Sequence, residues 1–214
     1  MQPPGHSGEP CVEVIATRER LRELTGRPTS RAVNKVIDQL DAVCRRFIAA
    51  SPFVLVASRG DDGGIAVSPK GDPPGFVAVL DDKTLAIPDR PGNHRHDTFE
   101  NVLACPDVGL CFLVPGHGDT LRVGGKARIV RDSRLQARLA VGGKAPNLVL
   151  VVTVERVFMH CSKCVTRSAL WTPDRWPDRT DVPDLVEAIM AHARPTETRS
   201  EVEAFIDAHN RHLY

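Results

Sequence analysis

Apolar residues follow two different spacings along the chain, and the change between them occurs near residue 50. Residues 17–24 predict a short helix by their apolar spacing. Residues 31–50, after a cap at Thr29 and Ser30, predict one long amphipathic helix, because their apolar positions recur with the helical period. Pro52 ends this pattern, and beyond it apolar and polar residues alternate as they do in strands.

Short strands joined by tight turns make up the second pattern. The segments FVLVAS and GIAVS flank a DDGG turn and predict a hairpin. The turns at residues 81–83 and 115–118 are too short for crossover helices, so the sheet is expected to be mostly antiparallel. This predicts a mainly β fold, a small antiparallel barrel with flanking helices. Further strands are expected at residues 76–80, 84–87, 108–114, 119–124, 126–130 and 148–154.

Three more helices are expected: one at residues 132–140, before the last of these strands, and two that close the chain, at residues 183–193 and 201–212. Ser200 and Glu203 are the predicted caps of the last one. The stretch TPDRWPDRTDVP between barrel and helices is a linker by composition. The chain is therefore expected to contain a disordered N-terminus (residues 1–16), a barrel domain with N-terminal helices (17–171), and a linker with C-terminal helices (172–214).

The composition makes two functions less expected, namely nucleic-acid binding and a membrane-spanning role. The 214 residues are 42% hydrophobic and 26% charged, with a net charge of +1, so no strong attraction to nucleic acid is implied. The longest apolar run, residues 148–152, is far too short to cross a bilayer. We expect a cytoplasmic protein with reduced thiols, no membrane association and no nucleic-acid partner.

A loop rich in cations and turn-forming residues lies at residues 85–100, LAIPDRPGNHRHDTFE. Arg90 and Arg95 bracket its turn, and a short helix follows, with Asp97 as the predicted N-cap and Glu100 as its capping-box partner. The first turn of a helix offers unpaired N–H groups to a phosphate. The predicted phosphate donors are the two arginine side chains, the Asn93 side chain and the Thr98 hydroxyl. The alternative is a solvated loop before a capped helix.

A basic strand face is the second candidate for ligand contact. Thr120, Arg122, Lys126 and Arg128 fall on one face of the strands at residues 119–130, opposite an apolar face. Such a face can be simply solvated, or it can meet a cofactor or a second subunit.

Other chemistry-bearing motifs are incomplete. His160, Cys161 and Cys164 offer at most three metal ligands, whereas a structural zinc takes four, so no metal is expected. The same C-x-x-C lacks the βαβ context of a thioredoxin-like redox pair. The sequence contains no G-x-S-x-G elbow, Walker loop or G-x-G-x-x-G turn. A phosphate loop beside a barrel therefore favours a flat phosphorylated cofactor over catalysis by side chains alone.

Three segments together carry a family resemblance: GIAVSPKGDPPGF with the following PDRPGN, then TLRVGGKARI, then HCSKCVTRSALW. The chain resembles the pyridoxamine 5′-phosphate oxidase-like family, in its branch of flavin-nucleotide-binding proteins. The resemblance implies a split β-barrel homodimer that holds FMN between its subunits. It differs from the founding oxidase in having His96, Asp97 and Thr98 where that enzyme has Ser-Arg-Lys, and the oxidase's C-terminal substrate-binding signature is not evident.

The resemblance also implies roles for particular residues. Along the flavin ring it places Ser68, Pro69 and Lys70. At the phosphate it places Arg90, Asn93, Arg95 and Thr98. It implies that Thr120 and Arg122 reach the flavin from the other subunit. It also implies that Arg167, Ser168 and Trp171 belong to the C-terminal segment that covers the cofactor.

The expected function is FMN-dependent oxidoreduction of a small-molecule substrate that the sequence does not identify. No catalytic acid or base is assigned; His160 and His117 are candidates only because histidine titrates in the useful range. One alternative is a flavin-binding protein without turnover that acts as a carrier or redox sensor, with Cys161 and Cys164 as possible redox partners. Another is a deazaflavin-dependent reductase on the same fold.

Overall fold

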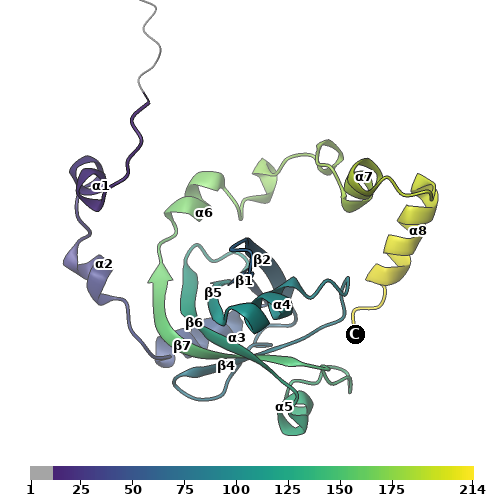
Figure 1. Cartoon of the computed structure of the whole chain (residues 1–214), viewed down its shortest axis with the longest axis horizontal. Helices are drawn as coiled ribbons and strands as arrows, with labels where there is room; N and C mark the ends of the chain where they lie inside the picture. Colours follow the sequence, from purple (N-terminus) through teal and green to yellow (C-terminus); the bar gives the residue numbers. More distant parts are fainter. Residues whose placement is uncertain (1–11) are drawn as a thin grey trace, which may run out of the picture. The chain divides into compact units, whose positions relative to one another are not determined.

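The computed structural model describes residues 12–214, which form two units (Figure 1). The first unit ends at Lys35 and the second covers Val36–Tyr214. Residues 1–11, most of the segment predicted to be disordered, lie outside the described residues.

The first unit contains two short helices, α1 (Arg18–Thr25) and α2 (Ser30–Asn34). The hydroxyl groups of Thr17 and Thr29 cap them, each accepting a hydrogen bond from the backbone N–H three residues later, at 3.2 and 3.3 Å. No described residue of this unit is buried. The prediction of the first helix is confirmed within a residue at each end.

The long helix predicted over residues 31–50 is wrong, because the chain leaves the helical path in the middle of it. After α2, Ile37 pairs with Val157 through two backbone hydrogen bonds of 3.0 and 2.7 Å. A new helix, α3 (Ala42–Ala50), then begins at Asp41, whose carboxylate accepts the N–H of Cys44 at 2.8 Å. Backbone groups that bond to the sheet are no longer available to continue a helix.

A seven-stranded antiparallel sheet forms the body of the second unit, in the order β2-β1-β5-β6-β7-β4-β3. The sheet is not closed, since β2 and β3 are its edges. The predicted mainly β fold, an antiparallel split barrel with flanking helices, is confirmed. The strands are β1 (Phe53–Arg59), β2 (Ile65–Gly71), β3 (Ala78–Val79), β4 (Thr84–Pro88), β5 (Asp107–Leu113), β6 (Thr120–Val130) and β7 (Val149–His160).

One β-bulge joins two segments that were predicted as separate strands. Residues 119–124 and 126–130 belong to the single strand β6, and the pairing with β7 shifts between Gly124 and Gly125. Gly124 faces Arg156 and Gly125 faces Val154, so Glu155 is the extra residue. A side chain at Gly125 would lie 2.0 Å from the backbone oxygen of Thr153, so only glycine fits there without movement.

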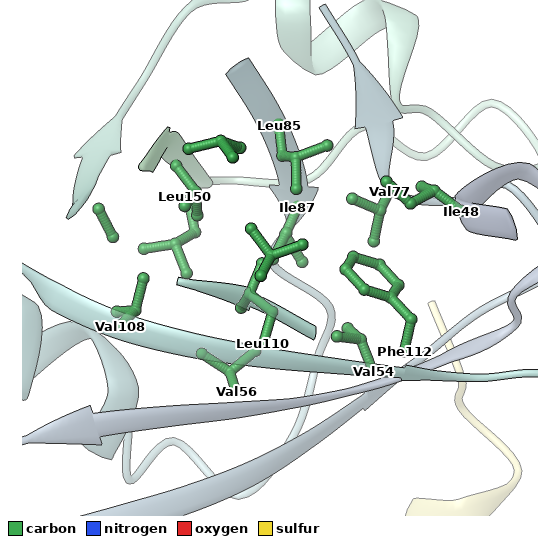
Figure 2. Packing of buried hydrophobic residues seen from close by; sticks show 14 of the residues in the cluster. Ile48, Val54, Val56, Val77, Leu85, Ile87, Val108, Leu110, Phe112 and Leu150 are labelled. Atoms are coloured by element: carbon green, nitrogen blue, oxygen red, sulfur yellow. The ribbon is translucent and has the colours of Figure 1, made fainter. Parts of the chain in front are cut away.

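The apolar core lies against the inner face of the sheet. Phe112 is fully buried, and Figure 2 shows side chains of β1, β4, β5 and β7 meeting around it. The strand β4 is buried on both faces, because Leu85 and Ile87 enter this core while Ala86 packs with Leu139 in a second cluster. The chain therefore leaves β4 from a firmly held position, and the loop that follows starts there.

Helices flank the sheet at several points. Helix α4 (Asp97–Ala104) packs on β1, β2 and β6. The predicted helix at residues 132–140 is present as α5 (Ser133–Arg138), and α6 (Lys163–Ser168) follows β7. After two 3₁₀ turns, η1 (Pro173–Arg175) and η2 (Arg179–Asp181), come α7 (Leu185–Ala188), a π-helical turn η3 (Ile189–Ala193) and α8 (Arg199–Asn210).

The last predicted helix is present, but its predicted cap is wrong. Thr198, not Ser200, is the N-cap of α8, and Glu201 completes the capping box. Glu203 instead pairs with Arg199, its Oε1 lying 2.8 Å from the guanidinium. Among residues 12–214, no helix is long and apolar enough to cross a membrane.

Candidate ligand-binding cleft

A cleft of about 770 Å³ lies between the end of β2, the loop that runs from β4 to α4, and the segment after α8. Its volume is within the range of about 300–1,000 Å³ typical of cofactor sites. The structure brings together here the first two groups of predicted residues, namely Ser68, Pro69, Lys70, Arg90, Asn93, Arg95 and Thr98.

The loop between β4 and α4, residues 89–96, has an unusual backbone. His94 and His96 both adopt left-handed conformations, with φ of 58° and 53°. The Asn93 side-chain oxygen accepts the N–H of Arg95 at 3.1 Å, which holds the turn. The predicted cap is wrong here as well, because His96 is the N-cap of α4 and makes no side-chain cap bond, while Asp97 is already helical. The start of the helix is therefore left without a capping side chain.

Thr98 is the most informative residue of the cleft. The residue is part of the cleft lining but is only 3% exposed. Its hydroxyl oxygen is buried and has no hydrogen-bond partner among the described residues. A buried hydroxyl without a partner costs about 1–3 kcal/mol. A polar ligand atom in the cleft would remove that cost.

Hydrogen bonds within the chain hold the Arg90 side chain in the wall of the cleft. Its Nε donates to Asp72 Oδ2 at 2.6 Å, and one Nη donates to the Leu139 carbonyl oxygen at 2.8 Å. The Asp72 side chain is 1% exposed, so this ion pair is largely removed from solvent. Arg95 is different, because its side chain is 72% exposed and its one ion pair here, with Asp97, spans 3.2 Å. Arg95 is thus the more adaptable cation.

Tyr214 completes the wall. Its ring lies 5.5 Å from the Arg90 guanidinium carbon, and its hydroxyl donates to the second oxygen of Asp72. That hydrogen bond, with burial and the charge of Asp72, raises the pKa of the Tyr214 phenol. The phenol therefore stays a proton donor to Asp72 across the neutral range.

The electrostatic balance of the cleft favours an anion. Lys70, Arg90 and Arg95 line it together with four histidines, against three carboxylates. One of these carboxylates, Asp89, is half-buried, and burial raises its pKa, while neighbouring cations and histidines act in the opposite direction. Asp72 and Asp97 are paired with arginines.

The other five predicted residues do not line this cleft. Thr120 pairs with His160 where β6 begins and β7 ends, and Arg122 is exposed on β6. Arg167 and Ser168 belong to α6, which follows directly, and the Trp171 indole donates to the His117 carbonyl oxygen at 2.9 Å. These residues thus form a second group around the β6–β7 end.

Sequence reasoning missed several residues of the cleft. Asp72 lies two residues after Lys70 in the SPKGD motif, so the motif was recognised but the role of Asp72 was not. Tyr214, His209 and His212 lie far from the motif in sequence, and no spacing rule connects them to it. Tyr214 is the one tyrosine of the sequence, but nothing in the sequence connects it to the loop at residues 85–100.

The H-C-x-x-C group gives no metal centre in the structure. No cluster of three or more His, Cys, Asp or Glu within residues 12–214 has the arrangement of a metal site. Cys161 and Cys164 are free, exposed thiols. Cys44, by contrast, is buried in the core, and burial together with Asp41 raises its pKa to about 11.

Comparison with known proteins identifies the family. Residues 40–161 match the family model described as pyridoxamine 5′-phosphate oxidase. The chain belongs to the pyridoxamine 5′-phosphate oxidase family. The match includes β2 and the loop before α4, whereas Tyr214 and α8 lie beyond it. The family resemblance read from the sequence is confirmed.

Several solved structures are similar to this chain. HupZ from Group A Streptococcus is 22% identical over 55% of this chain and 91% of its own, with a TM-score of 0.45. A candidate pyridoxamine 5′-phosphate oxidase from Lactobacillus delbrueckii is 24% identical over 57% and 95%, with a TM-score of 0.45. An FAD-binding protein from Mesorhizobium loti is 22% identical over 58% and 96%, with a TM-score of 0.41. No curated protein sequence matches the chain.

Proposed function

We propose that this chain is an FMN-binding oxidoreductase, in which the cleft holds the flavin nucleotide and its ring passes hydride or electrons to or from a small-molecule substrate. Membership of the pyridoxamine 5′-phosphate oxidase family supports a flavin-type cofactor. The observation that carries the proposal is the buried Thr98 hydroxyl, which has no hydrogen-bond partner among the described residues and belongs to a residue of a cleft lined by cations.

The phosphate fits the start of α4. The helix offers there its unpaired N–H groups and positive end, and no side chain among residues 12–214 caps it. Thr98, Arg95 and the Asn93 amide are the assigned donors, with Arg90 as a fixed cation in the wall. Arg95 also offsets the negative charge of Asp97, which would otherwise oppose a phosphate.

The flavin ring fits along β2. Ser68, Pro69 and Lys70 line the cleft from this edge strand, and Pro69 can sit there because an edge strand does not need every N–H. Bound FMN would supply the redox chemistry, and the chain's own residues would bind and orient it. Half-buried Lys70 is placed to stabilise negative charge on the ring.

A homodimer is part of the proposal. Thr120, Arg122, Arg167, Ser168 and Trp171 lie away from the cleft of their own chain, so we assign them to the cleft of a second copy. The edge strand β2 supports this assignment, because it leaves Ile65 and Val67 68% and 58% exposed, and Val67 lines the cleft. Burial of such side chains against a second copy would be favourable.

A second candidate keeps the flavin site but lacks turnover. Cys161 and Cys164 are both free and exposed at the end of β7, which suits a redox-sensing role beside a bound flavin. Mixing the flavin-loaded protein with reduced nicotinamide and other donors separates the two, since a flavin that is never reduced leaves only the sensing or carrier role. The absorbance spectrum of the bound cofactor distinguishes FMN from a deazaflavin.

The central test uses Thr98→Val, which removes the hydroxyl and keeps the shape. Dissociation constants for FMN and riboflavin are measured by fluorescence quenching on the full chain. We expect FMN binding to weaken by about tenfold, because one hydrogen bond to a charged group is worth about 1.5–3 kcal/mol. Riboflavin binding should stay within about twofold, because riboflavin has no phosphate.

Thr153→Val is the matched control, since Thr153 is exposed on β7 and does not line the cleft. It should leave both affinities unchanged. Equal losses for FMN and riboflavin in Thr98→Val would contradict the assigned phosphate position. A wild-type protein that binds neither flavin would refute the proposed function.

A further inference from the structure

A second, smaller cavity of about 180 Å³ lies against the cleft. Both are lined by residues 89–92, His94, His96 and Tyr214. These residues therefore form the partition between the two spaces. Thr98 and Arg95 line only the cleft, whereas residues 144–147 line only the small cavity. The proposed phosphate position thus lies on one side of the partition, and the small cavity lies on the other.

Tyr214 is the part of this partition that the loop itself does not supply. Three contacts hold it in place: its hydroxyl bonds to Asp72, its ring covers Arg90, and its backbone oxygen accepts a hydrogen bond from Lys144 Nζ at 2.7 Å. Asp72 belongs to the end of β2, and Lys144 to the loop before β7. Tyr214 therefore contacts both the end of β2 and the loop before β7.

The small cavity is suited to an anion. Lys144 lies at the end of a tight turn in which Gly142 and Gly143 have positive φ of 56° and 80°. Two histidines and Asn147 add further donors, and Asp89 is the single acidic residue in the described lining. A phosphate group that reached this cavity would meet the Lys144 ammonium, which donates one hydrogen bond to the Tyr214 backbone oxygen.

We propose that Tyr214 determines ligand specificity by closing the phosphate end of the cleft, so that the protein prefers a flavin mononucleotide to a flavin dinucleotide. This inference rests on the proposed function, because it takes the phosphate to lie at α4. A dinucleotide continues beyond its first phosphate. With Tyr214 in place, its second phosphate meets the ring and the bond between Tyr214 and Lys144. Without the ring, the two spaces join and the second phosphate can approach Lys144, which keeps its hydrogen bond to the backbone oxygen of residue 214.

The test measures dissociation constants for FMN, FAD and riboflavin with the full chain and three variants. In Tyr214→Ala, the ratio of the FAD to the FMN dissociation constant should fall by about tenfold or more, which corresponds to about 1.4 kcal/mol. Tyr214→Phe keeps the ring and loses only the hydroxyl, so it should retain most of the wild-type ratio. Adding Lys144→Met to Tyr214→Ala should weaken FAD binding and change FMN binding little.

The possible results separate the role of Tyr214 from structural support and from the proposed function. Equal loss of FMN and FAD affinity in Tyr214→Ala would show that Tyr214 only supports Arg90, and would overturn the inference. A wild-type protein that binds FMN and FAD equally well would also overturn it, while the flavin function would stand. A wild-type protein that binds none of the three flavins would overturn both. Riboflavin binding and thermal unfolding of each variant report whether the fold is intact.

Discussion

Ser51 and Thr98 are both buried hydroxyl residues, but they lie in two regions of the molecule that treat polar groups differently. Ser51 is the C-cap of α3, just before β1, and is 1% exposed; its Oγ is 2.7 Å from the Leu113 carbonyl oxygen and 2.8 Å from that of Phe53. Thr98 is buried almost as completely and has no such partner among the described residues. The Ser51 hydroxyl is hydrogen-bonded within the protein, whereas the Thr98 hydroxyl is left without a partner among the described residues.

The same contrast extends to the backbone and the charges. The loop at residues 89–96 holds His94 and His96 in left-handed conformations, each of which costs about 1–2 kcal/mol for a residue with a side chain. The Asp89 carboxylate in this loop is half-buried, and this burial raises its pKa. Local costs of this kind persist only where surrounding structure imposes them, and they concentrate at binding sites. Here the fully buried strand β4 supplies that constraint.

The largest expected effect lies in the sheet. Phe112→Ala removes a ring that is fully buried, and it should lower the free energy of unfolding by about 3–5 kcal/mol. Phe205→Ala is the matched control, because Phe205 is 70% exposed on α8 and its loss should cost less than about 0.5 kcal/mol. Urea unfolding measures both. Similar costs for the two variants would mean that the sheet core does not dominate stability.

The two hydroxyl groups give a smaller, opposite pair of effects. Ser51→Ala should cost about 1–3 kcal/mol, because carbonyl oxygens lose their partner. Thr98→Val, measured without ligand, should instead raise the free energy of unfolding by about 1 kcal/mol, since it removes an unsatisfied group. The same urea titrations apply. A loss of stability in Thr98→Val would show that its hydroxyl is satisfied and would remove the contrast between the two regions.

The smallest effect concerns Asp89 and depends on pH. Because the pKa of Asp89 is raised in the folded protein, the folded state holds this proton more tightly than the unfolded state does. Wild-type stability is therefore favoured below the ordinary carboxylate pKa and declines as the pH rises through the raised value. Asp89→Asn should raise the melting temperature at pH 8, which corresponds to a gain of less than about 1 kcal/mol in the free energy of unfolding. This gain should shrink toward about pH 4.

The exposed residue Asp207 on α8 provides the comparison for this effect. Asp207→Asn should change the melting temperature little at either pH, as surface substitutions usually do. A gain for Asp89→Asn that is equal at both pH values would have a cause other than the ionisation of Asp89.

Local sequence patterns predicted those elements in which each face stays in the same environment, core or solvent, along its whole length. The alternation in β1 and β5 was readable because one face of each strand enters the core. The helical spacing of residues 31–50 was misleading, because Ile37 uses its backbone to pair with Val157, far away in sequence. The N-cap prediction at Asp97 failed for a local reason, since the helix already begins at Asp97 and the carboxylate pairs with Arg95.

Taken alone, the sequence determined the antiparallel sheet, the family and the cationic loop before α4, because each depends on residues that are neighbours along the chain. Only the tertiary structure decided that Asp72, Arg90 and Tyr214 meet, that the Thr98 hydroxyl is buried without a partner, and that a partition separates the cleft from the cavity beside Lys144. Burial and long-range hydrogen bonds depend on which distant segments pack together, and no local pattern encodes that packing.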